Sequence, residues 1–200
     1  MSQPGLRERK KLRTRWAIQA HALRLVAEQG YDQTTVDQIA AAAEISPSTF
    51  FRYFKTKEDV ILDDEYDPIM VSAIDAAPAE LSPLEAIRHA IVGALGSLTP
   101  AAEAKLAERS TLILSVPALR ARVYESFGGQ LELVAGPVAR RLGREPGDVE
   151  VRVICGAVVG AMLAAVFDWA ERGAKERLGT TLVRAIDVLA DGMPVRSPRP

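Results

Sequence analysis

Apolar residues recur at three- and four-residue intervals along most of the chain, the spacing of one face of an α-helix. No stretch shows the convincing two-residue alternation of a β-strand. Cap residues, prolines and glycines indicate where helices begin and end. After a first helix that ends before Gly30, the pattern predicts helices over residues 36–43, 47–53, 57–66, 83–98, 100–114, 117–142, 148–172 and 175–189. The predicted fold class is therefore all-α.

Two short predicted helices lie close together between residues 35 and 57. Thr35 is a good helix cap, and Gln38, three residues later, completes a capping box. The apolar stripe of this helix follows at Val36, Ile39, Ala40 and Ala43. Ser46 followed by Pro47 marks the start of the second helix. Two short helices joined by a tight turn are typical of a helix-turn-helix DNA reader.

The second of these helices has two different sides. Phe50 and Phe54 are four residues apart and share one side, while Thr49, Arg52 and Tyr53 point elsewhere. Any small helical bundle has caps and alanines. A plain bundle does not explain why its shortest helix carries hydroxyl, aromatic and guanidinium groups outward. These groups favour contact with nucleic acid.

Charge is unevenly distributed along the chain. Residues 1–57 contain ten basic and five acidic side chains, a net charge of +5, whereas the remainder is net −6. The total of −1 conceals this division. Taken alone, the run RERKKLRTR is most simply a solvated basic tail. Beside a helix-turn-helix, it is better interpreted as an arm that contacts phosphates.

Residues 18–62 resemble the TetR family of bacterial transcriptional repressors. The family's order and spacing are matched by Gly30-Tyr31, Thr35-Val36, Ile39-Ala40, Ser46, Thr49, Phe54 and Lys57. The resemblance implies a three-helix DNA-binding head over residues 1–56 and a helical ligand-binding and dimerisation domain over residues 57–200. It also implies a cytoplasmic homodimer that binds a palindromic double-stranded DNA operator and is released by a small effector.

Three residues depart from that family's pattern. Glu44 stands in the turn where glycine is usual, and a left-handed conformation there costs a non-glycine residue about 1 kcal/mol. A slightly different turn is therefore expected. Phe51 replaces the usual tyrosine and is interpreted as a packing or methyl contact. His21 replaces a small residue and is interpreted as packing between helices.

The helix-turn-helix residues have expected roles at DNA. Ser46, Ser48, Thr49 and Arg52 are candidates for base or phosphate contact, while Tyr53, Lys57 and the basic arm should mainly hold phosphates. The full set of candidate DNA-binding residues is Arg13, Thr35, Ser46, Ser48, Thr49, Phe51, Arg52, Tyr53 and Lys57.

The helix predicted over residues 148–172 has small side chains at four-residue spacing. Glycine inside a helix costs up to about 1 kcal/mol, and close approach of another helix is a compensation. Packing within one subunit is the simpler interpretation, but a four-helix dimer bundle is favoured because a two-fold dimer suits a palindromic operator. The candidate dimer-interface residues are Gly156, Gly160, Ala164 and Trp169.

The C-terminal domain also resembles a TetR subgroup with an acyl-CoA-like ligand-binding domain. Its marks are the segment 116–120, the Arg141-Leu142-Gly143 sequence and Trp169. This resemblance implies a lipophilic effector, either a fatty acid or an acyl-CoA. An apolar pocket with a few orienting polar groups is expected, although Leu and Met are more often core residues. Candidate pocket residues are Met70, Ala94, Leu98, Arg109, Leu112, Phe127, Met162 and Phe167, with Ser110 and Thr111 as further polar groups.

Other function classes find little support in the sequence. Two histidines and one cysteine show no metal-ligand spacing, and there is no nucleophile motif or phosphate loop, so neither an enzyme nor a cofactor is predicted. Cys155 alone excludes an intrachain disulfide and fits a reducing cytoplasm. The uncharged run 153–167 is short for a membrane span and is interpreted as a buried helix. An architectural DNA binder without a ligand is the remaining alternative.

Overall fold

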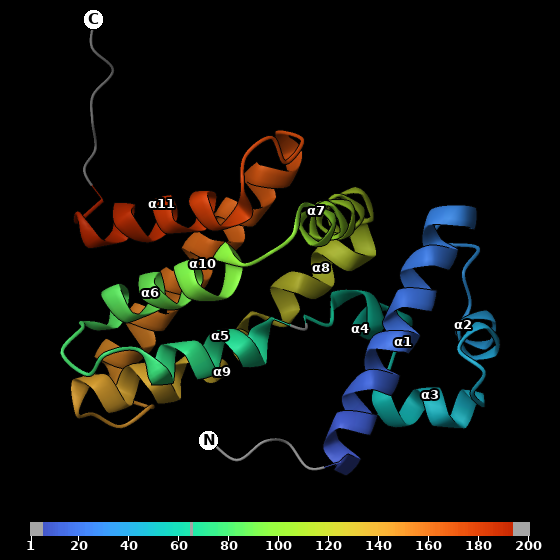
Figure 1. Ribbon diagram of the computed structural model, residues 1–200, viewed down its shortest axis with the longest axis horizontal. Helices are drawn as coiled ribbons and strands as arrows, with labels where there is room; N and C mark the ends of the chain where they lie inside the picture. Colours follow the sequence, from blue (N-terminus) through green and yellow to red (C-terminus); the bar gives the residue numbers. More distant parts are fainter. Residues whose placement is uncertain (1–5, 65, 194–200) are drawn as a thin grey trace, which may run out of the picture. The chain divides into compact units, whose positions relative to one another are not determined.

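The computed structural model describes residues 6–64 and 66–193, and within them all regular structure is helical, which confirms the all-α prediction (Figure 1). The helices are α1 Leu6–Gln29, α2 Val36–Ala42, α3 Pro47–Tyr53, α4 Lys57–Leu62, α5 Asp67–Ala76, α6 Pro83–Gly96, α7 Pro100–Ser115, α8 Pro117–Glu125, α9 Phe127–Leu142, α10 Val149–Glu171 and α11 Leu178–Ala190.

The chain divides into two compact units. The first unit, here called the head, is Met1–Glu65 together with Val116–Arg122; the second, here called the body, is Tyr66–Ser115 together with Val123–Pro200. The sequence predicted one boundary at residue 56. In the structure α4 belongs to the head, and so does the first part of α8.

The head is built around one apolar core. In the head α1 packs on α2 and α4, and α2 packs on α3 (Figure 1). The fully or almost fully buried side chains that join these helices are Ile18, Ala22, Val26, Ile39, Ala40, Phe50, Phe54, Val60 and Ile61. Burying apolar surface is the main favourable term in folding, so this core holds the short helices in place.

Local caps define the short helices of the head, as the sequence predicted. Thr35 and Gln38 form the capping box of α2, and Ser46 caps α3 with Pro47 at its first position. Thr56 caps α4 by accepting a hydrogen bond from the backbone N–H of Asp59. Each cap satisfies a backbone donor that would otherwise lack a partner.

Glu44 adopts the left-handed conformation that the family's glycine would take, with φ of 54°. The N–H of Glu44 bonds to the carbonyl of Ala41 at 3.1 Å, and the N–H of Ile45 bonds to the carbonyl of Ala40 at 3.0 Å. These two bonds form the usual left-handed ending of a helix. The expectation of a differently built turn was therefore wrong. The chain makes the standard turn, and the backbone of Glu44 is strained in it.

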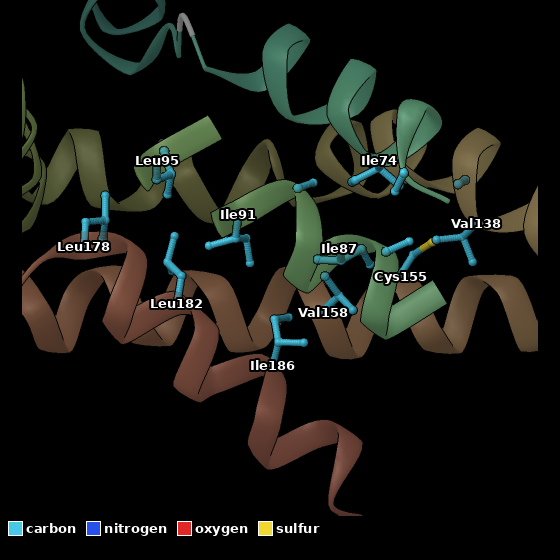
Figure 2. Packing of buried hydrophobic residues seen from close by; sticks show 14 of the residues in the cluster. Ile74, Ile87, Ile91, Leu95, Val138, Cys155, Val158, Leu178, Leu182 and Ile186 are labelled. Carbon is cyan, nitrogen blue, oxygen red and sulfur yellow. The ribbon is translucent and has the colours of Figure 1, made fainter. Parts of the chain in front are cut away.

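The body has its own core, in which α10 packs against α7, α9 and α11, and α6 packs against α5 and α11. Figure 2 shows side chains from these helices meeting in one cluster, including Ile87 and Ile91 of α6, Val158 of α10 and Ile186 of α11. Cys155 lies inside this cluster, where burial raises the pKa of its thiol. This agrees with a packing role for the cysteine.

The structure differs from the predicted helices in several places. The single helix expected over 117–142 is broken at Ser126 into α8 and α9, where Gly128 and Gly129 weaken the first turn of α9. The connecting helix ends at Leu62 rather than at residue 66, because Asp63 turns to an extended conformation. The helix α5, which has a proline in its first turn, was not predicted.

Candidate functional site

The outward side of α3 brings most of the candidate base-contacting residues together. Ser46, Ser48, Phe51 and Arg52 are exposed, while Thr49 and Tyr53 are half-buried. On the opposite side of the helix Phe50 is fully buried in the head core. A seven-residue helix with this division presents one short face that a DNA major groove can accept.

The hydroxyl groups at the start of α3 form a local network. The Ser46 hydroxyl lies 2.9 Å from the Ser48 hydroxyl and 3.0 Å from the Thr49 hydroxyl, and it accepts a hydrogen bond from the Thr49 N–H at 3.1 Å. The network caps α3 and fixes the orientation of its first turn. Helix N-termini of this kind attract phosphate oxygens.

Three further candidates, Arg13, Thr35 and Lys57, lie outside α3. Arg13 is exposed on α1, as are Lys10 and Lys11. Thr35 is exposed, but its hydroxyl accepts the N–H of Gln38 at 3.3 Å as part of the capping box. The side chains of residues 6–9, which carry the rest of the expected basic arm, lie outside the described side chains.

Lys57 is engaged within the head. Its ammonium donates to the carbonyls of Tyr31 at 2.8 Å and Thr34 at 3.0 Å, and it lies 3.8 Å from the centre of the Tyr31 ring. The Tyr31 hydroxyl donates to Glu58, and burial together with this bond raises the pKa of Tyr31 above its ordinary value. Lys57 therefore fixes the start of α4 against the turn between α1 and α2.

Arg15 joins three parts of the head. Its guanidinium donates to both carboxylate oxygens of Asp63 at 2.6 and 2.5 Å, and to the carbonyl of Tyr53 at 3.0 Å. It also lies 4.4 Å from the centre of the Phe54 ring. The hydrogen bond to Asp63 is the largest cause of a raised pKa at Arg15. The end of α3 and the end of α4 are thus tied to the same residue of α1.

Gln19 strengthens this contact between helices. The Gln19 side-chain amide donates to the carbonyls of Val60 at 3.1 Å and Asp63 at 2.6 Å. We call the group formed by Arg15, Gln19, Tyr53 and Asp63 the Arg15 clamp. Sequence reasoning placed Arg15 in the basic arm and missed its role. The one available signal was its four-residue spacing from Gln19, which puts both side chains on the same side of α1.

The segment Val116–Arg122 supplies a second hold on α4. Arg122 forms an ion pair with Asp59 at 3.3 Å, and Leu119 is fully buried. Both belong to the head unit. Because this segment continues directly into the body through α8, a residue distant in sequence is built into the DNA-binding unit.

The candidate dimer residues divide into two groups. A Cβ added at Gly156 or Gly160 would meet no atom within 4 Å, and Ala164 is exposed. Trp169, in contrast, is only 3% exposed, and its indole N–H donates to the carbonyl of Glu176 at 2.7 Å. Trp169 thus packs in the core of its own subunit and exposes little surface, whereas the glycines and Ala164 have space beside them.

The candidate pocket residues are all partly exposed. Met70, Leu98 and Met162 pack against the buried cluster of the body. The other candidates with intermediate exposure are Ala94, Arg109, Leu112, Phe127 and Phe167. Among the further polar groups, Ser110 is buried on α7 and Thr111 is exposed. Three of the eight pocket candidates thus lie against the apolar core, and none of the eight belongs to its buried centre.

Within the described residues, no group of three or more His, Cys, Asp or Glu side chains is arranged to hold a metal ion. One described helix, α10, has the length and apolar composition of a membrane span, and 28% of its most apolar stretch is buried. Length and composition of this kind also occur in helices that pack inside a protein, and α10 packs against α7, α9 and α11.

Two family profiles match the chain. Residues 18–63 match the profile described as "Bacterial regulatory proteins, tetR family", and residues 81–194 match the "MftR C-terminal domain" profile of the same class of regulators. The first match covers the second half of α1 together with α2, α3 and α4, and the second begins just before α6 and continues past the end of α11.

Curated relatives point the same way. The chain is 45% identical over 95 residues to the HTH-type transcriptional regulator TcmR of Streptomyces glaucescens, covering 46% of this chain and 42% of that protein. It is 28% identical over 174 residues to the putative mycofactocin biosynthesis transcriptional regulator MftR of Mycobacterium tuberculosis, covering 86% and 87% of the two chains.

Solved structures share the fold. The fatty acid degradation regulator FadR of Bacillus halodurans is 21% identical with a TM-score of 0.55, covering 98% of this chain and all of that chain. The FadR of Thermus thermophilus, a TetR-family repressor solved with lauroyl-CoA, is 24% identical with a TM-score of 0.52, covering 93% of this chain and 98% of that chain. Together with the profile that matches over half of the chain, these findings show that the protein belongs to the TetR family of DNA-binding transcriptional regulators, a non-enzymatic family, and has an MftR-like C-terminal domain.

Proposed function

We propose that this protein is a ligand-responsive repressor that binds a palindromic operator as a homodimer and leaves it when a small lipophilic effector binds. The observation that carries this proposal is the outward face of α3, where hydroxyl, aromatic and guanidinium groups are held on a rigid, capped helix. The repressor's ordinary place of action would be the cytoplasm, where its operator lies.

The head residues have distinct roles in this proposal. Arg52, Ser48 and Thr49 face the base edges, and Ser46 orients them. Tyr53, Thr35 and Arg13 contact phosphates. Phe51 supplies an apolar contact.

Lys57 has two N–H donors bound to carbonyls, and an ammonium has three, so one remains for a phosphate. Lys57 therefore combines a structural role with an electrostatic one.

The exposed side of α10 supports the homodimer. Val149 and Val153 are 68% and 64% exposed, and Ala157 and Ala164 continue the same side of the helix with exposed small side chains. Gly160 lies on this side with no atom within 4 Å of an added Cβ. Such an apolar, small-residue surface allows close approach of the matching helix of a second copy.

The composition of the body supports a lipophilic effector. Its partly buried candidates are mostly Ala, Leu, Met and Phe side chains, with Arg109 and Ser110 as polar groups. The Thermus FadR, which shares this fold, was solved with lauroyl-CoA. A fatty acyl group, free or as its coenzyme A thioester, is therefore our proposed effector class.

The contacts around α4 support a route for release. The chain passes between the head and the body at three points, next to Tyr66, Val116 and Val123. Asp63, close in sequence to the first point, joins the end of α4 to the Arg15 clamp. Arg122, next to the third point, holds α4 through its ion pair with Asp59. An effector that favours another arrangement of the body would shift the population of heads able to bind DNA.

The experiment that tests this function is a DNA-binding titration with the DNA beside the protein's own gene, repeated at several salt concentrations. Sequence-specific binding that weakens steeply with salt is expected. Lys57→Ala should weaken binding to every sequence about equally and lower the salt slope by about one unit. Salt-insensitive binding, or no binding to any of this DNA, would contradict the proposal.

A further inference from the structure

The middle of α3 carries an exposed apolar side chain on an otherwise polar face. The Phe51 side chain is 55% exposed, and its exposed neighbours Ser48 and Arg52 are polar. A phenyl ring neither donates nor accepts a hydrogen bond, so it can neither hold a phosphate nor pair with the polar edge of a base. Its surface must be covered by another apolar group to be useful.

The Phe51 ring is braced from behind. It packs edge-on against Phe50, with ring centres 5.5 Å apart and planes at 87°, and Phe50 is fully buried. Phe50 in turn packs against Phe54, with ring centres 5.8 Å apart. A ring supported in this way loses little further freedom on binding, and edge-to-face pairs favour a fixed geometry.

The neighbouring hydroxyls are already engaged with one another. Ser46 interacts with the hydroxyls of both Ser48 and Thr49 and with the Thr49 N–H. Among the exposed side chains of this face, the hydroxyls and Arg52 can pair with polar base edges, and Phe51 is the one suited to an apolar group of a base. In the major groove the one apolar group that distinguishes a base is the C5-methyl of thymine.

We infer that Phe51 reads the methyl group of a thymine in each half of the operator. This inference rests on the proposed function, in which α3 enters the major groove. It assigns Phe51 a specificity-determining role for one base type.

The experiment replaces thymine by deoxyuridine, which differs only by lacking the methyl group. A preferred operator is first selected with the wild-type protein from random double-stranded DNA. Each thymine is then replaced in turn, symmetrically in both half-sites, and the affinity is measured. At one position the affinity should fall by about fourfold per half-site, the effect of about 0.8 kcal/mol for one methyl group removed from water.

Variants separate this role from others. Phe51→Ala should bind the thymine and deoxyuridine operators equally, whereas Phe51→Tyr, which keeps the ring, should retain the preference for thymine. Arg52→Ala serves as the matched control, because it changes a neighbour on the same helix face and should also retain that preference. Thermal unfolding of each variant confirms that the head is folded.

Three results would overturn the inference. Insensitivity of the wild type to every deoxyuridine replacement would show that no thymine methyl is read. Equal weakening of both operators by Phe51→Ala, with the preference retained, would place the ring on the sugar-phosphate backbone. Absence of any sequence-specific binding by the wild type would overturn the proposed function as well. The first two results differ from this one, because in both of them the wild type still binds its operator.

Discussion

Glu44 holds a left-handed backbone conformation that side chains with a Cβ avoid. Replacing it with glycine removes that strain, and the greater freedom of glycine in the unfolded chain offsets only part of the gain. We predict that Glu44→Gly raises the free energy of unfolding by about 0.5 kcal/mol, the part of the strain that the offset leaves. Urea denaturation measures this directly. Glu44→Ala keeps the Cβ while removing the charge, so an equal gain in that variant would show that charge, not strain, was responsible.

Arg52 is the exposed guanidinium on the outward face of α3. If it binds a guanine edge, Arg52→Ala should reduce discrimination at one operator position by about 1–3 kcal/mol, while other positions keep their preferences. Competition among single-base operator variants measures this. Arg24→Ala is the matched control, since Arg24 lies on α1 in an ion pair with Glu28. A uniform loss across all operators would instead make Arg52 a phosphate contact.

Single residues were predictable where their partners are near in sequence. The caps at Thr35, Ser46 and Thr56 depend on bonds to residues three positions away, so the local pattern contains them. The bonds of Lys57 span at least 23 positions and those of Arg15 at least 38. A single sequence does not reveal the partners of such long-range bonds, so the charge of both residues alone predicts phosphate contacts.

At the scale of elements, α3 and α4 depend on the Arg15 clamp for their mutual position. Arg15→Gln removes the paired bonds to Asp63 and the bond to the Tyr53 carbonyl. Hydrogen bonds to charged groups contribute about 1.5–3 kcal/mol when buried, and partial exposure of this pair lowers that contribution, so we expect a loss of about 1–2 kcal/mol in the free energy of unfolding.

The measurement for the clamp is urea denaturation, combined with operator titration. Operator affinity should fall even at temperatures where the Arg15→Gln head is fully folded, because α3 is no longer fixed to α1 and α4. Arg24→Gln, a change of the same type on the same helix, should leave both quantities unchanged. Wild-type stability and wild-type operator affinity in Arg15→Gln would refute a positioning role for the clamp.

The helix α10 carries the prediction about assembly. Within the subunit a side chain at residue 160 meets open space, so Gly160→Leu should fold normally. Across a dimer interface the same side chain would force the helices apart, at a cost of about 1–3 kcal/mol. Sedimentation should therefore show a shift toward monomer, with weaker operator binding.

The control for assembly is Gly93→Leu, because Gly93 on α6 also has open space around an added Cβ. That variant should stay in the wild-type assembly state. A wild type that sediments as a monomer at micromolar concentration would exclude the α10 dimer.

The order of elements was predictable to a greater extent than their ends. The capping box at Ser82 and Glu85 gave the start of α6, and the glycine after α9 marked its end. The break at Ser126 and the end of α4 at Asp63 were not predicted. Asp63 leaves the helix while its carboxylate is held by Arg15, 48 positions earlier, and periodicity does not record such tertiary contacts.

At the scale of the whole molecule, the head and the body together form a regulator only if binding events in each affect the other. The buried cluster of the body contains mostly Ile, Leu, Val and Ala, and the pocket candidates Met70, Leu98 and Met162 pack against it. An acyl chain that enters such surroundings should gain up to about 0.8 kcal/mol per buried methylene until the available space is filled.

The most direct test is release of labelled operator DNA from the wild-type protein by acyl-CoAs of increasing chain length. We predict release at concentrations that fall as the chain lengthens and then level off. Operator DNA must in turn weaken acyl-CoA binding by the same factor, because coupling between two binding sites is reciprocal. Failure of every acyl chain to release the operator, with release by a polar or aromatic compound, would contradict the acyl effector; failure of every compound to do so would contradict ligand-responsive repression itself.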